Sequence, residues 1–321
     1  MGKLIDGVWH DVWYETKSND GNFVREDAGF RHWLTNDGEQ GPEGQQGFKA
    51  GSGRYHLYVS LACPWAHRTL IFRQLKGLAP HIDVTVVSPD MQENGWTFIP
   101  PEPLYGFRFL HQLYTKAKPD YTGRVTVPVL WDKQTQTIVS NESSEIIRMF
   151  NTAFNDLTGN HADYYPQALK TGIDQWNDYI YPAINNGVYR CGFATTQEAY
   201  EAAFSDLFAA LDKVDAHLAT SRYLVGEQIT EADWRLFTTL IRFDAVYVGH
   251  FKCNLKRIAD YTNIQGYLKE LYQFANVAET VDFNHIKRHY YFSHQMINPT
   301  GIVPVGPELD FDSPHGRDHR N

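Results

Sequence analysis

The feature that most constrains the fold is a short apolar segment that leads into a cysteine–proline pair and then a helix. Residues 54–59 (RYHLYV) are rich in aromatic and β-branched side chains, which favours a strand. Cys63 and Pro64 follow, and residues 64–75 are typical of a helix, in whose first turn a proline costs little. The Cys63 sulfur is therefore expected at a helix N-terminus, where unsatisfied N–H groups and the helix dipole lower the pKa of a thiol.

The residues after Cys63 indicate which thiol chemistry is available. Ala66 occupies the position at which a C-x-x-C pair would place its second cysteine. Cys63 therefore needs an external thiol to resolve any disulfide that it forms, which points to glutathione. His67 and Arg68 add positive charge nearby. The alternative is a buried structural cysteine, because cysteines are often buried.

Length, charge and cysteine content indicate how many domains to expect and which classes of partner to exclude. The chain has 321 residues, so two domains are expected. Its net charge is −9 and its basic residues are scattered, which argues against nucleic acid and anionic membranes as partners. The N-terminus lacks the apolar core of a signal peptide, and no apolar run reaches the length of a membrane span. Three distant cysteines give no disulfide framework, so we expect a cytoplasmic protein.

Two further cofactor classes are not expected. There is no phosphate-binding G-x-x-x-x-G-K-S/T loop and no G-x-G-x-x-G motif after a strand, which argues against a nucleotide. His285 and His289 have helical spacing and His250 precedes Cys253, but neither pair has a third ligand, so we expect no metal. Cys191 and Cys253 show no activating pattern.

Residues 54–155 have the order of elements of an α/β thioredoxin-like domain. After the Cys63 segment the sequence predicts a strand at 82–87, an irregular stretch at 88–123, and strands at 125–132 and 137–140. A helix at 146–150, opened by residues 141–145, completes the domain. Pro128 opens the third strand, where this fold places a cis peptide bond, although an ordinary trans proline is the alternative. Residues 1–53 form an N-terminal extension with little periodic structure, and its Gly-rich part, 36–53, is expected to be a loop. The aromatic residues of the extension indicate that it packs on the protein.

The pattern changes to successive helices over residues 165–297. The expected helices are 166–185, 196–219, 231–245, 263–274 and 282–291. Thr230 and Asp233 have the spacing of a helix N-terminal box. Residues 298–321 are rich in Pro, Gly and charge, so we expect an extended tail whose last residues are frayed.

This combination of a thioredoxin-like domain with a redox cysteine and an all-α C-terminal domain resembles the cytosolic glutathione transferase fold. Within it, nearly the whole chain resembles the glutathionyl-hydroquinone reductases, the Xi class. The motif Cys63–Arg68 alone would also suit the omega class, and the N-terminal extension and the His-Tyr-Tyr tail favour the Xi class. The matching motifs are Trp9-His10-Asp11 with Trp13-Tyr14, Phe30-Arg31 with Trp33, Cys63-Pro64-Trp65-Ala66-His67-Arg68, Asn94-Gly95-Trp96, Val127-Pro128-Val129-Leu130-Trp131-Asp132, Ser140-Asn141-Glu142-Ser143, Gly187-Val188-Tyr189, Val246-Tyr247-Val248 with His250-Phe251-Lys252-Cys253, and His289-Tyr290-Tyr291-Phe292-Ser293-His294 with Asn298-Pro299-Thr300.

The resemblance implies an activity and a mechanism. The Cys63 thiolate attacks the sulfur of a glutathionyl-hydroquinone, the hydroquinone leaves, and a second glutathione releases the Cys63–glutathione mixed disulfide as oxidised glutathione. Glutathione is then a co-substrate, and neither a metal nor a nucleotide takes part. The family also implies a homodimer.

Five residues are implied to bind glutathione. Val127 would pair with it through its backbone, and Glu142 and Ser143 would hold its γ-glutamyl group at a helix start, although capping of the helix alone is the alternative. Trp96, expected to be exposed in a loop, and Arg124, a forked donor for the glycyl carboxylate, resemble further contacts. Arg124 could equally form a surface ion pair.

Three tyrosines of the helical domain match aromatic substrate residues of the family. Tyr189, Tyr247 and Tyr290 are implied to bind the hydroquinone ring, and Tyr189 and Tyr290 to assist catalysis as proton donors. Tyr291 points elsewhere on a regular helix, so a structural role is expected.

Two other functions stay open from the sequence. An omega-like thioltransferase or dehydroascorbate reductase would share the Cys63 chemistry. A transferase-like domain used for assembly or as a ligand carrier would not need Cys63, and the retained nucleophile argues against it.

Overall fold

The computed structural model describes residues 2–318 and divides into two compact units. One unit contains the residues up to Trp13 together with Glu26–Asp163, and the other contains Tyr14–Arg25 and the chain from Tyr164 onward. The N-terminal extension is thus shared between the units. The boundaries expected from the sequence stay predictions.

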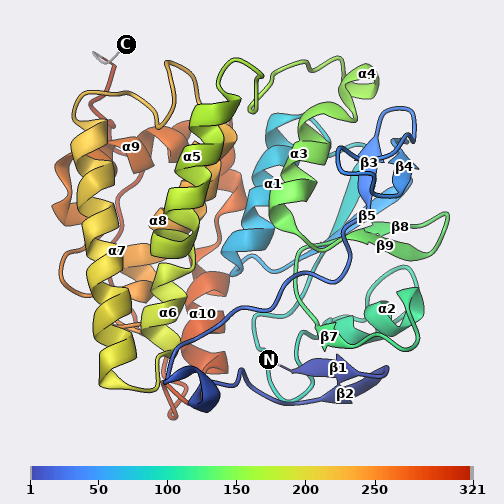
Figure 1. Ribbon diagram of the computed structural model, residues 1–321, viewed down its shortest axis with the longest axis horizontal. Coiled ribbons are helices and arrows are strands. Elements are labelled where there is room, and N and C mark those ends of the chain that lie inside the picture. Colours follow the sequence, from blue (N-terminus) through green and yellow to red (C-terminus); the bar gives the residue numbers. More distant parts are fainter. Residues whose placement is uncertain (1, 319–321) are drawn as a thin grey trace. The chain divides into compact units, whose positions relative to one another are not determined.

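The first unit is built on a four-stranded sheet in the order β6-β5-β8-β9. The central strand β5 runs parallel to β6 and antiparallel to β8, which pairs antiparallel with β9. Helices α1 and α3 lie side by side against this sheet (Figure 1). This is the βαβ…ββα order predicted from the sequence, and every residue of β5 is buried, as its apolar composition requires. The elements are β5 (Tyr55–Val59), α1 (Pro64–Leu75), β6 (Ile82–Val86), β8 (Val129–Asp132), β9 (Thr137–Ser140) and α3 (Ser143–Thr152).

The third strand is shorter than predicted, because β8 begins only at Val129. The backbone of Thr126 is held by a side chain instead of a neighbouring strand: the Tyr114 hydroxyl donates to the Thr126 carbonyl at 2.7 Å and accepts from its N–H at 3.2 Å. The peptide bond between Val127 and Pro128 is cis, as predicted.

The stretch 88–123 is not wholly irregular, because it contains α2 (Leu110–Ala117). This helix buries Leu110, Leu113 and Tyr114, which have the i, i+3, i+4 spacing of one helical face. Two turns of helix are too short for that spacing to stand out in a segment rich in proline and aromatic residues. A second short helix, α4 (Asn155–Thr158), was also not predicted.

The extension contains short strands, so the expectation of little regular structure over residues 1–53 is wrong in part. A three-stranded sheet has the order β2-β1-β7, and β3 pairs parallel with β4, which lies inside the predicted loop 36–53. Strands of two or three residues show no alternation that a sequence could reveal. They are β1 (Lys3–Ile5), β2 (Val8–His10), β3 (Trp33–Thr35), β4 (Gly47–Lys49) and β7 (Gly123–Arg124).

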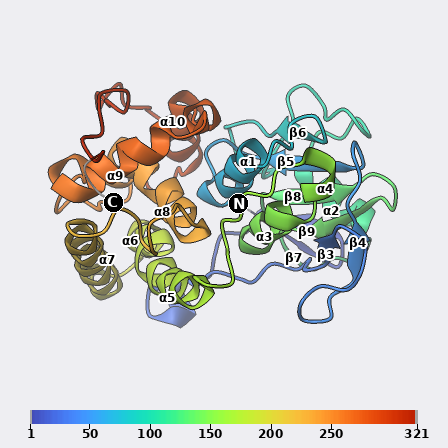
Figure 2. The same ribbon diagram turned by 90° about the horizontal axis from the view of Figure 1, so that it is seen from above.

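The second unit is helical, as predicted (Figure 2). The expected helix 166–185 begins later, as α5, and continues into the π-helical segment η2; likewise 231–245 is α8 followed by the π-helical η3. Helix α6 was not predicted, and its two glycines explain why. The elements are η1 (Lys17–Asn19), α5 (Lys170–Ile180), η2 (Tyr181–Asn185), α6 (Gly187–Phe193), α7 (Gln197–Leu218), α8 (Glu231–Arg242), η3 (Phe243–Tyr247), η4 (Ile258–Asp260), α9 (Thr262–Gln273), η5 (Val277–Thr280) and α10 (Phe283–Ser293).

The predicted N-terminal box of α8 is confirmed. The Asp233 carboxylate accepts from the backbone N–H of Thr230 at 2.8 Å and from its hydroxyl at 2.9 Å. Both residues are buried, so the box also satisfies polar groups inside the helical unit.

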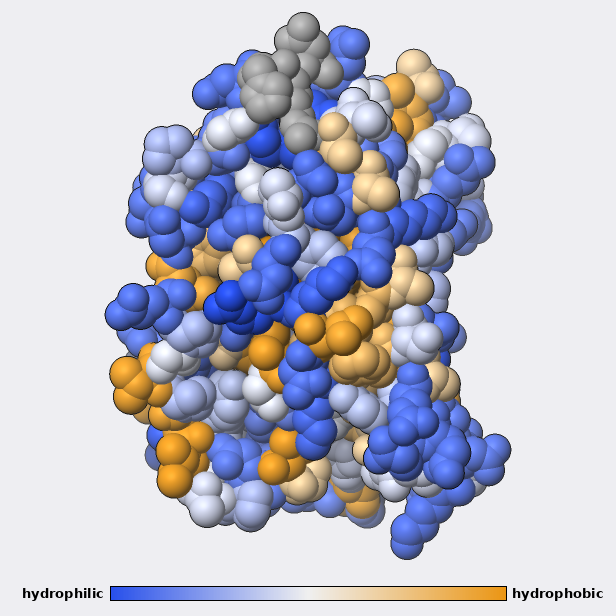
Figure 3. All heavy atoms as spheres, turned by 90° about the vertical axis from the view of Figure 1, so that its left-hand side faces the viewer, coloured by the Kyte–Doolittle hydropathy of each residue, from blue (hydrophilic) through white to orange (hydrophobic). Residues whose placement is uncertain are grey.

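The tail has neither helix nor strand over residues 298–318, in agreement with the extended chain expected. It is nevertheless anchored, because Phe311 stacks on Phe283 and the buried Arg317 pairs with Glu270 at 2.9 Å. The fraying expected for the final residues falls mainly on 319–321, which lie outside the described residues. Within residues 2–318 no helix is long and apolar enough to cross a membrane. The face drawn in Figure 3 is mainly polar, with its apolar side chains in separate groups.

Candidate functional site

Cys63 lies where the sequence predicts, immediately before the first turn of α1. It is the N-cap residue, in an extended backbone conformation, and Pro64 occupies the first helical position. The side chain is partly exposed, and its Sγ donates to the Val127 carbonyl oxygen at 3.6 Å. A thiol at a helix N-terminus faces the positive end of the dipole, which favours its thiolate.

Val127 places backbone polar groups beside this sulfur. Its carbonyl accepts from Cys63, whereas no hydrogen bond within residues 2–318 uses its N–H. Because β8 begins only at Val129, Val127 lies outside the sheet and its N–H is not used in strand pairing next to the cysteine. An extended peptide could pair with it, and the role of Val127 in binding glutathione stays a prediction.

Ser143 begins α3 and is buried next to a cation from α1. Arg68, also buried, donates to the Ser143 hydroxyl at 3.4 Å, and its guanidinium lies 4.5 Å from the centre of the Trp65 ring. A helix N-terminus with a buried guanidinium beside it is suited to a carboxylate. The sequence assigned Arg68 only to the charge near Cys63, so its contact with the predicted γ-glutamyl site was missed.

Glu142 caps α3, which is the alternative that the sequence left open. One oxygen of its carboxylate accepts from both the backbone N–H of Ser144, at 3.0 Å, and its hydroxyl, at 2.7 Å. Capping by one oxygen is compatible with a second partner for the carboxylate, so binding by Glu142 stays a prediction.

Trp96 is not the exposed loop residue that was expected, since only 3% of its surface is accessible. The loop is folded against α2: the Trp96 carbonyl accepts from the N–H of Leu110 at 2.9 Å, and Thr97 bridges to Phe109. The loop that carries this buried indole is thus hydrogen-bonded to a helix that the sequence did not reveal. Its contact with glutathione stays a prediction.

Arg124 is buried and organises the N-terminal segment of its own unit. Its guanidinium donates to Glu26 at 2.9 Å and to the carbonyls of Val12 and Trp13 at 2.6 and 3.1 Å. The ion pair that the sequence allowed is therefore present, although on a buried arginine instead of a surface one. Whether Arg124 also binds a glycyl carboxylate stays a prediction.

Tyr189, Tyr247 and Tyr290, which we call the tyrosine cluster, come together in the helical unit. They come from α6, η3 and α10, and their hydroxyls form a chain with Tyr290 in the middle. The Tyr290 oxygen lies 2.6 Å from that of Tyr189 and 3.1 Å from that of Tyr247. The structure thus unites three residues that are up to 101 positions apart in the sequence.

Burial dominates the pKa of Tyr290, the central residue of the tyrosine cluster. It raises the pKa of Tyr290 well above its usual range; the neighbouring hydroxyls act in the same direction, and the Arg242 guanidinium opposes them. A tyrosine whose pKa is raised stays protonated, which is what a donor to a ring oxygen requires.

Aromatic side chains surround the cluster. Phe251 stacks on Tyr247 with ring centres 5.4 Å apart and lies edge-on to Tyr189 and Phe193. Gly192 permits this packing, because a Cβ there would lie 2.2 Å from the Phe251 ring. The rings fix the tyrosines in a rigid apolar setting.

Comparison with known proteins shows the family to which the chain belongs. Family models of the glutathione S-transferase N-terminal and C-terminal domains match residues 62–153 and 197–270. The chain is 60% identical to the glutathionyl-hydroquinone reductase YqjG of Escherichia coli, over all of this chain and 99% of that protein. It is also 54% identical to the glutathionyl-hydroquinone reductase PcpF of Sphingobium chlorophenolicum, over 96% of each chain. The chain belongs to the glutathionyl-hydroquinone reductases.

Solved structures agree with this family, which is the Xi class of glutathione S-transferases. The glutathione-bound structure of Escherichia coli YqjG matches with a TM-score of 0.91 and 57% identity, over 99% of each chain. The Xi-class transferase of Natrialba magadii matches with a TM-score of 0.93 and 48% identity, over 99% of this chain and 98% of that one. The resemblance drawn from the sequence is confirmed.

In this reductase-family chain, residues 14–25 of the extension belong to the helical unit. Phe23 is buried, with its ring 5.3 Å from that of Phe193 and 6.5 Å from that of Tyr189. Arg25 lies beside it, with its guanidinium 5.0 Å from the centre of the Tyr189 ring. The aromatic content of the extension predicted that it packs on the protein, but not that it reaches the tyrosine cluster.

The histidines behind the cluster are held neutral. His250 and His294 share a hydrogen bond of 3.2 Å between ring nitrogens, and both are buried. Burial, helped by the charge of Lys252, lowers the pKa of His250 to about 4, and burial also lowers the pKa of His294. No group of three or more His, Cys, Asp or Glu side chains suited to a metal occurs within residues 2–318.

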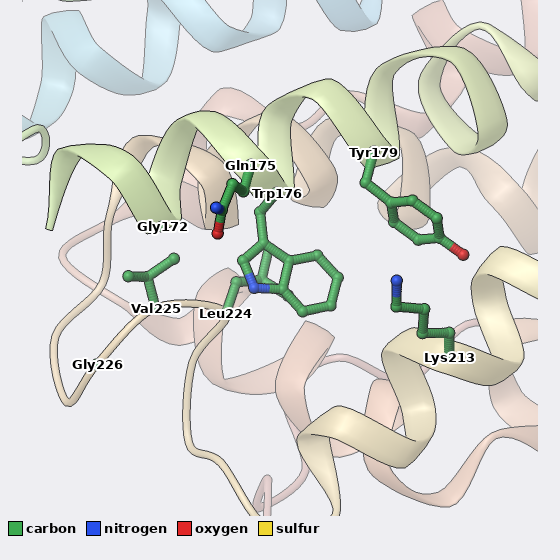
Figure 4. Close-up of a pocket in the computed structure, with 8 residues that line it drawn as sticks. All are labelled: Gly172, Gln175, Trp176, Tyr179, Lys213, Leu224, Val225 and Gly226. Atoms are coloured by element: carbon green, nitrogen blue, oxygen red, sulfur yellow. The ribbon is translucent and has the colours of Figure 1, made fainter.

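A cavity of about 390 Å³ lies in the helical unit, and none of its lining residues is one that the sequence selected. It is lined by side chains of α5, by Lys213 of α7 and by the loop 224–226. Figure 4 shows the Lys213 ammonium pointing toward Tyr179, and its nitrogen lies 3.8 Å from the centre of that ring. The cation is thus engaged with an aromatic ring of the wall.

Proposed function

We propose that this protein reduces glutathionyl-hydroquinones to free hydroquinones with glutathione as the reductant, through Cys63. The observation that carries the proposal is its full-length similarity to two proteins named as glutathionyl-hydroquinone reductases. The position of Cys63 before α1, where a thiolate is favoured, supplies the nucleophile that this chemistry needs.

The reaction proceeds in two steps, both of which pass through the Cys63 sulfur: carbon–sulfur cleavage and then thiol–disulfide exchange. The Cys63 thiolate attacks the glutathionyl sulfur, a sulfur–sulfur bond forms, the carbon–sulfur bond breaks, and the aromatic carbon gains a proton. A second glutathione thiolate then attacks the glutathionyl sulfur of the mixed disulfide and releases oxidised glutathione and the Cys63 thiolate. The sum converts one glutathionyl-hydroquinone and one glutathione into one hydroquinone and one oxidised glutathione.

Binding of glutathione is assigned to the first unit. The unused N–H and the carbonyl of Val127 pair with the cysteinyl part, and the start of α3 at Ser143, with Glu142, receives the γ-glutamyl group. Trp96 and Arg124 complete the assignment as further contacts. Arg68 supports Ser143 from α1.

Binding of the hydroquinone ring is assigned to the tyrosine cluster. Tyr247 contributes an aromatic face, while Tyr189 and Tyr290 donate protons to the ring oxygens. Donation stabilises negative charge that develops on the ring as the carbon–sulfur bond breaks.

The oligomeric state and the cellular location are assigned from the family. We propose that the protein is a homodimer and that it acts in the cytoplasm. The reducing, glutathione-rich conditions of that compartment suit a co-substrate that must be supplied as the thiol.

The proposal is tested by the release of hydroquinone from the conjugate of glutathione with 1,4-benzoquinone. The wild-type protein should turn it over with oxidised glutathione as the second product, and Cys63→Ala should not. Activity of the wild type only on the mixed disulfide of glutathione and 2-mercaptoethanol would favour an omega-like thioltransferase. Absence of both activities would favour a non-catalytic role.

A further inference from the structure

The N-terminal segment 14–25 is fixed to the helical unit at the end of α6. The N–H of Thr195 donates to the Gly21 carbonyl at 3.0 Å, and the hydroxyl of Thr196 donates to the Asp20 carbonyl at 3.0 Å. Gly21 has a φ of +81°, and a Cβ there would lie 2.4 Å from the Thr196 hydroxyl, so this close approach requires glycine. The segment therefore has a defined position relative to the helix that carries Tyr189.

Arg25 is the residue through which this segment reaches the tyrosine cluster. Its guanidinium lies over two rings, 5.0 Å from the centre of Tyr189 and 5.4 Å from that of Phe23. Its Nε donates to the Asn186 side-chain oxygen at 3.2 Å, which fixes the plane of the guanidinium. Arg25 is partly exposed, so folding of the helical unit does not depend on burying it.

A cation over the face of a phenol affects the hydroxyl of that phenol. Electron density that moves onto the Tyr189 ring, as its hydroxyl donates to a developing oxyanion, is stabilised by the positive charge above the ring. Since the Tyr189 oxygen lies 2.6 Å from that of Tyr290, the same charge acts on the whole hydroxyl chain. The contact with Arg25 also restricts the rotation of the Tyr189 ring.

We infer that Arg25 is a positioning residue for the reduction of glutathionyl-hydroquinones, acting through Tyr189. The inference rests on the proposed function, and it extends the set of residues that act on the ring to the N-terminal extension. Arg25 contacts Tyr189, Phe23 and Asn186 of the helical unit, so we assign it no role in binding glutathione. Its effect therefore falls on carbon–sulfur cleavage and not on thiol exchange.

Three variants test the inference against two substrates. Arg25→Gln removes the charge at similar length, and Arg25→Lys keeps the charge. Arg190→Gln is the matched control, because Arg190 follows Tyr189 in the same helix and pairs only at the surface with Asp206. The substrates are the glutathione–benzoquinone conjugate and the mixed disulfide of glutathione and 2-mercaptoethanol.

Arg25→Gln should lower kcat on the conjugate about tenfold, the size of a well-placed cation–π contact, with little change in KM. Arg25→Lys should recover most of this loss, Arg190→Gln should behave as wild type, and all three should retain turnover of the mixed disulfide. The inference is overturned if Arg25→Gln matches wild type on the conjugate, if only KM rises, or if both substrates lose activity in parallel. Failure of the wild type itself on the conjugate would instead overturn the proposed function, and the inference with it.

Discussion

The Cys63 site and the tyrosine cluster are built in different ways. Cys63 depends on backbone: it caps α1, and its sulfur donates to the carbonyl of Val127 beside the cis bond. The tyrosine cluster depends on side chains from three helical segments, whose hydroxyls meet in a buried chain. A site made of backbone tolerates few changes of the main chain, whereas a site made of side chains can be altered one group at a time. The two should therefore respond separately to mutation.

Cys63→Ala should have the largest effect. Because both proposed steps pass through the Cys63 sulfur, the variant should show no turnover above the uncatalysed rate on either the glutathione–benzoquinone conjugate or a glutathione mixed disulfide. Steady-state assays on both substrates measure this. Residual enzymatic turnover of the conjugate alone would mean that the tyrosine cluster acts without the cysteine.

Tyr290→Phe should separate the two sites. Loss of the central hydroxyl breaks both bonds of the chain and should lower kcat on the conjugate by about 100-fold, within the range of general acid catalysis. Turnover of the mixed disulfide, which involves no ring oxygen, should be unchanged. Tyr291→Phe is the matched control, since its hydroxyl contacts the Ala245 carbonyl at 3.5 Å and is not part of the hydroxyl chain. Equal losses on both substrates would contradict the separation.

The free energy of unfolding of the helical unit should depend on pH through His250. Its pKa is lowered to about 4 in the folded protein, from 6.5 when unfolded, so the unfolded state takes up a proton first as the pH falls. The free energy of unfolding should therefore decrease by about 2 kcal/mol between pH 7 and pH 5 through this group.

Urea unfolding of wild type and His250→Gln at both pH values measures this contribution. The variant should lose about 2 kcal/mol less than wild type over the same interval, since glutamine does not titrate. His81→Gln is the control, because His81 lies in the first unit, where its ring bonds to Ser52 in an exposed position. An equal loss in wild type and His250→Gln would contradict the account.

Glu142→Gln should have the smallest effect and should distinguish capping from binding. The amide oxygen can still accept from Ser144, so the melting temperature should change little. Loss of the charge should raise the KM for glutathione about fivefold, in keeping with the loss of about 1 kcal/mol from an ion pair. Equal KM values for variant and wild type would assign Glu142 to the cap alone.

The features that the sequence predicted and those that it missed differ in the same way as the Cys63 site and the tyrosine cluster. The Cys63 site is local, because a strand, a proline and a helix are all read from fewer than about 25 consecutive residues. The cis bond at Pro128 was predicted from the thioredoxin-like order of elements, whereas the box at Thr230, like the Cys63 segment, was predicted from residues close together in the chain. The box and the Cys63 segment depend on neighbours in the chain, which the sequence displays directly.

The features that the sequence missed are those set by distant partners. Trp96 is buried in a loop whose backbone is hydrogen-bonded to α2, and α2 is too short to be recognised. Arg68 reaches Ser143, 75 positions away, and Arg25 reaches Tyr189 from the extension. No local pattern marks such contacts. The membership of Tyr189, Tyr247 and Tyr290 in one site came from resemblance to a family and not from their spacing.

Transfer of the glutathionyl group from the ring to Cys63 is tested most directly in a single turnover without added glutathione. The enzyme is mixed with the glutathione–benzoquinone conjugate, quenched with acid, and analysed by intact mass and peptide mapping. We predict one glutathionyl group on Cys63 and one equivalent of free hydroquinone, with neither product in Cys63→Ala. Release of hydroquinone while Cys63 stays unmodified, or a glutathionyl group on Cys191 or Cys253 instead, would contradict the account.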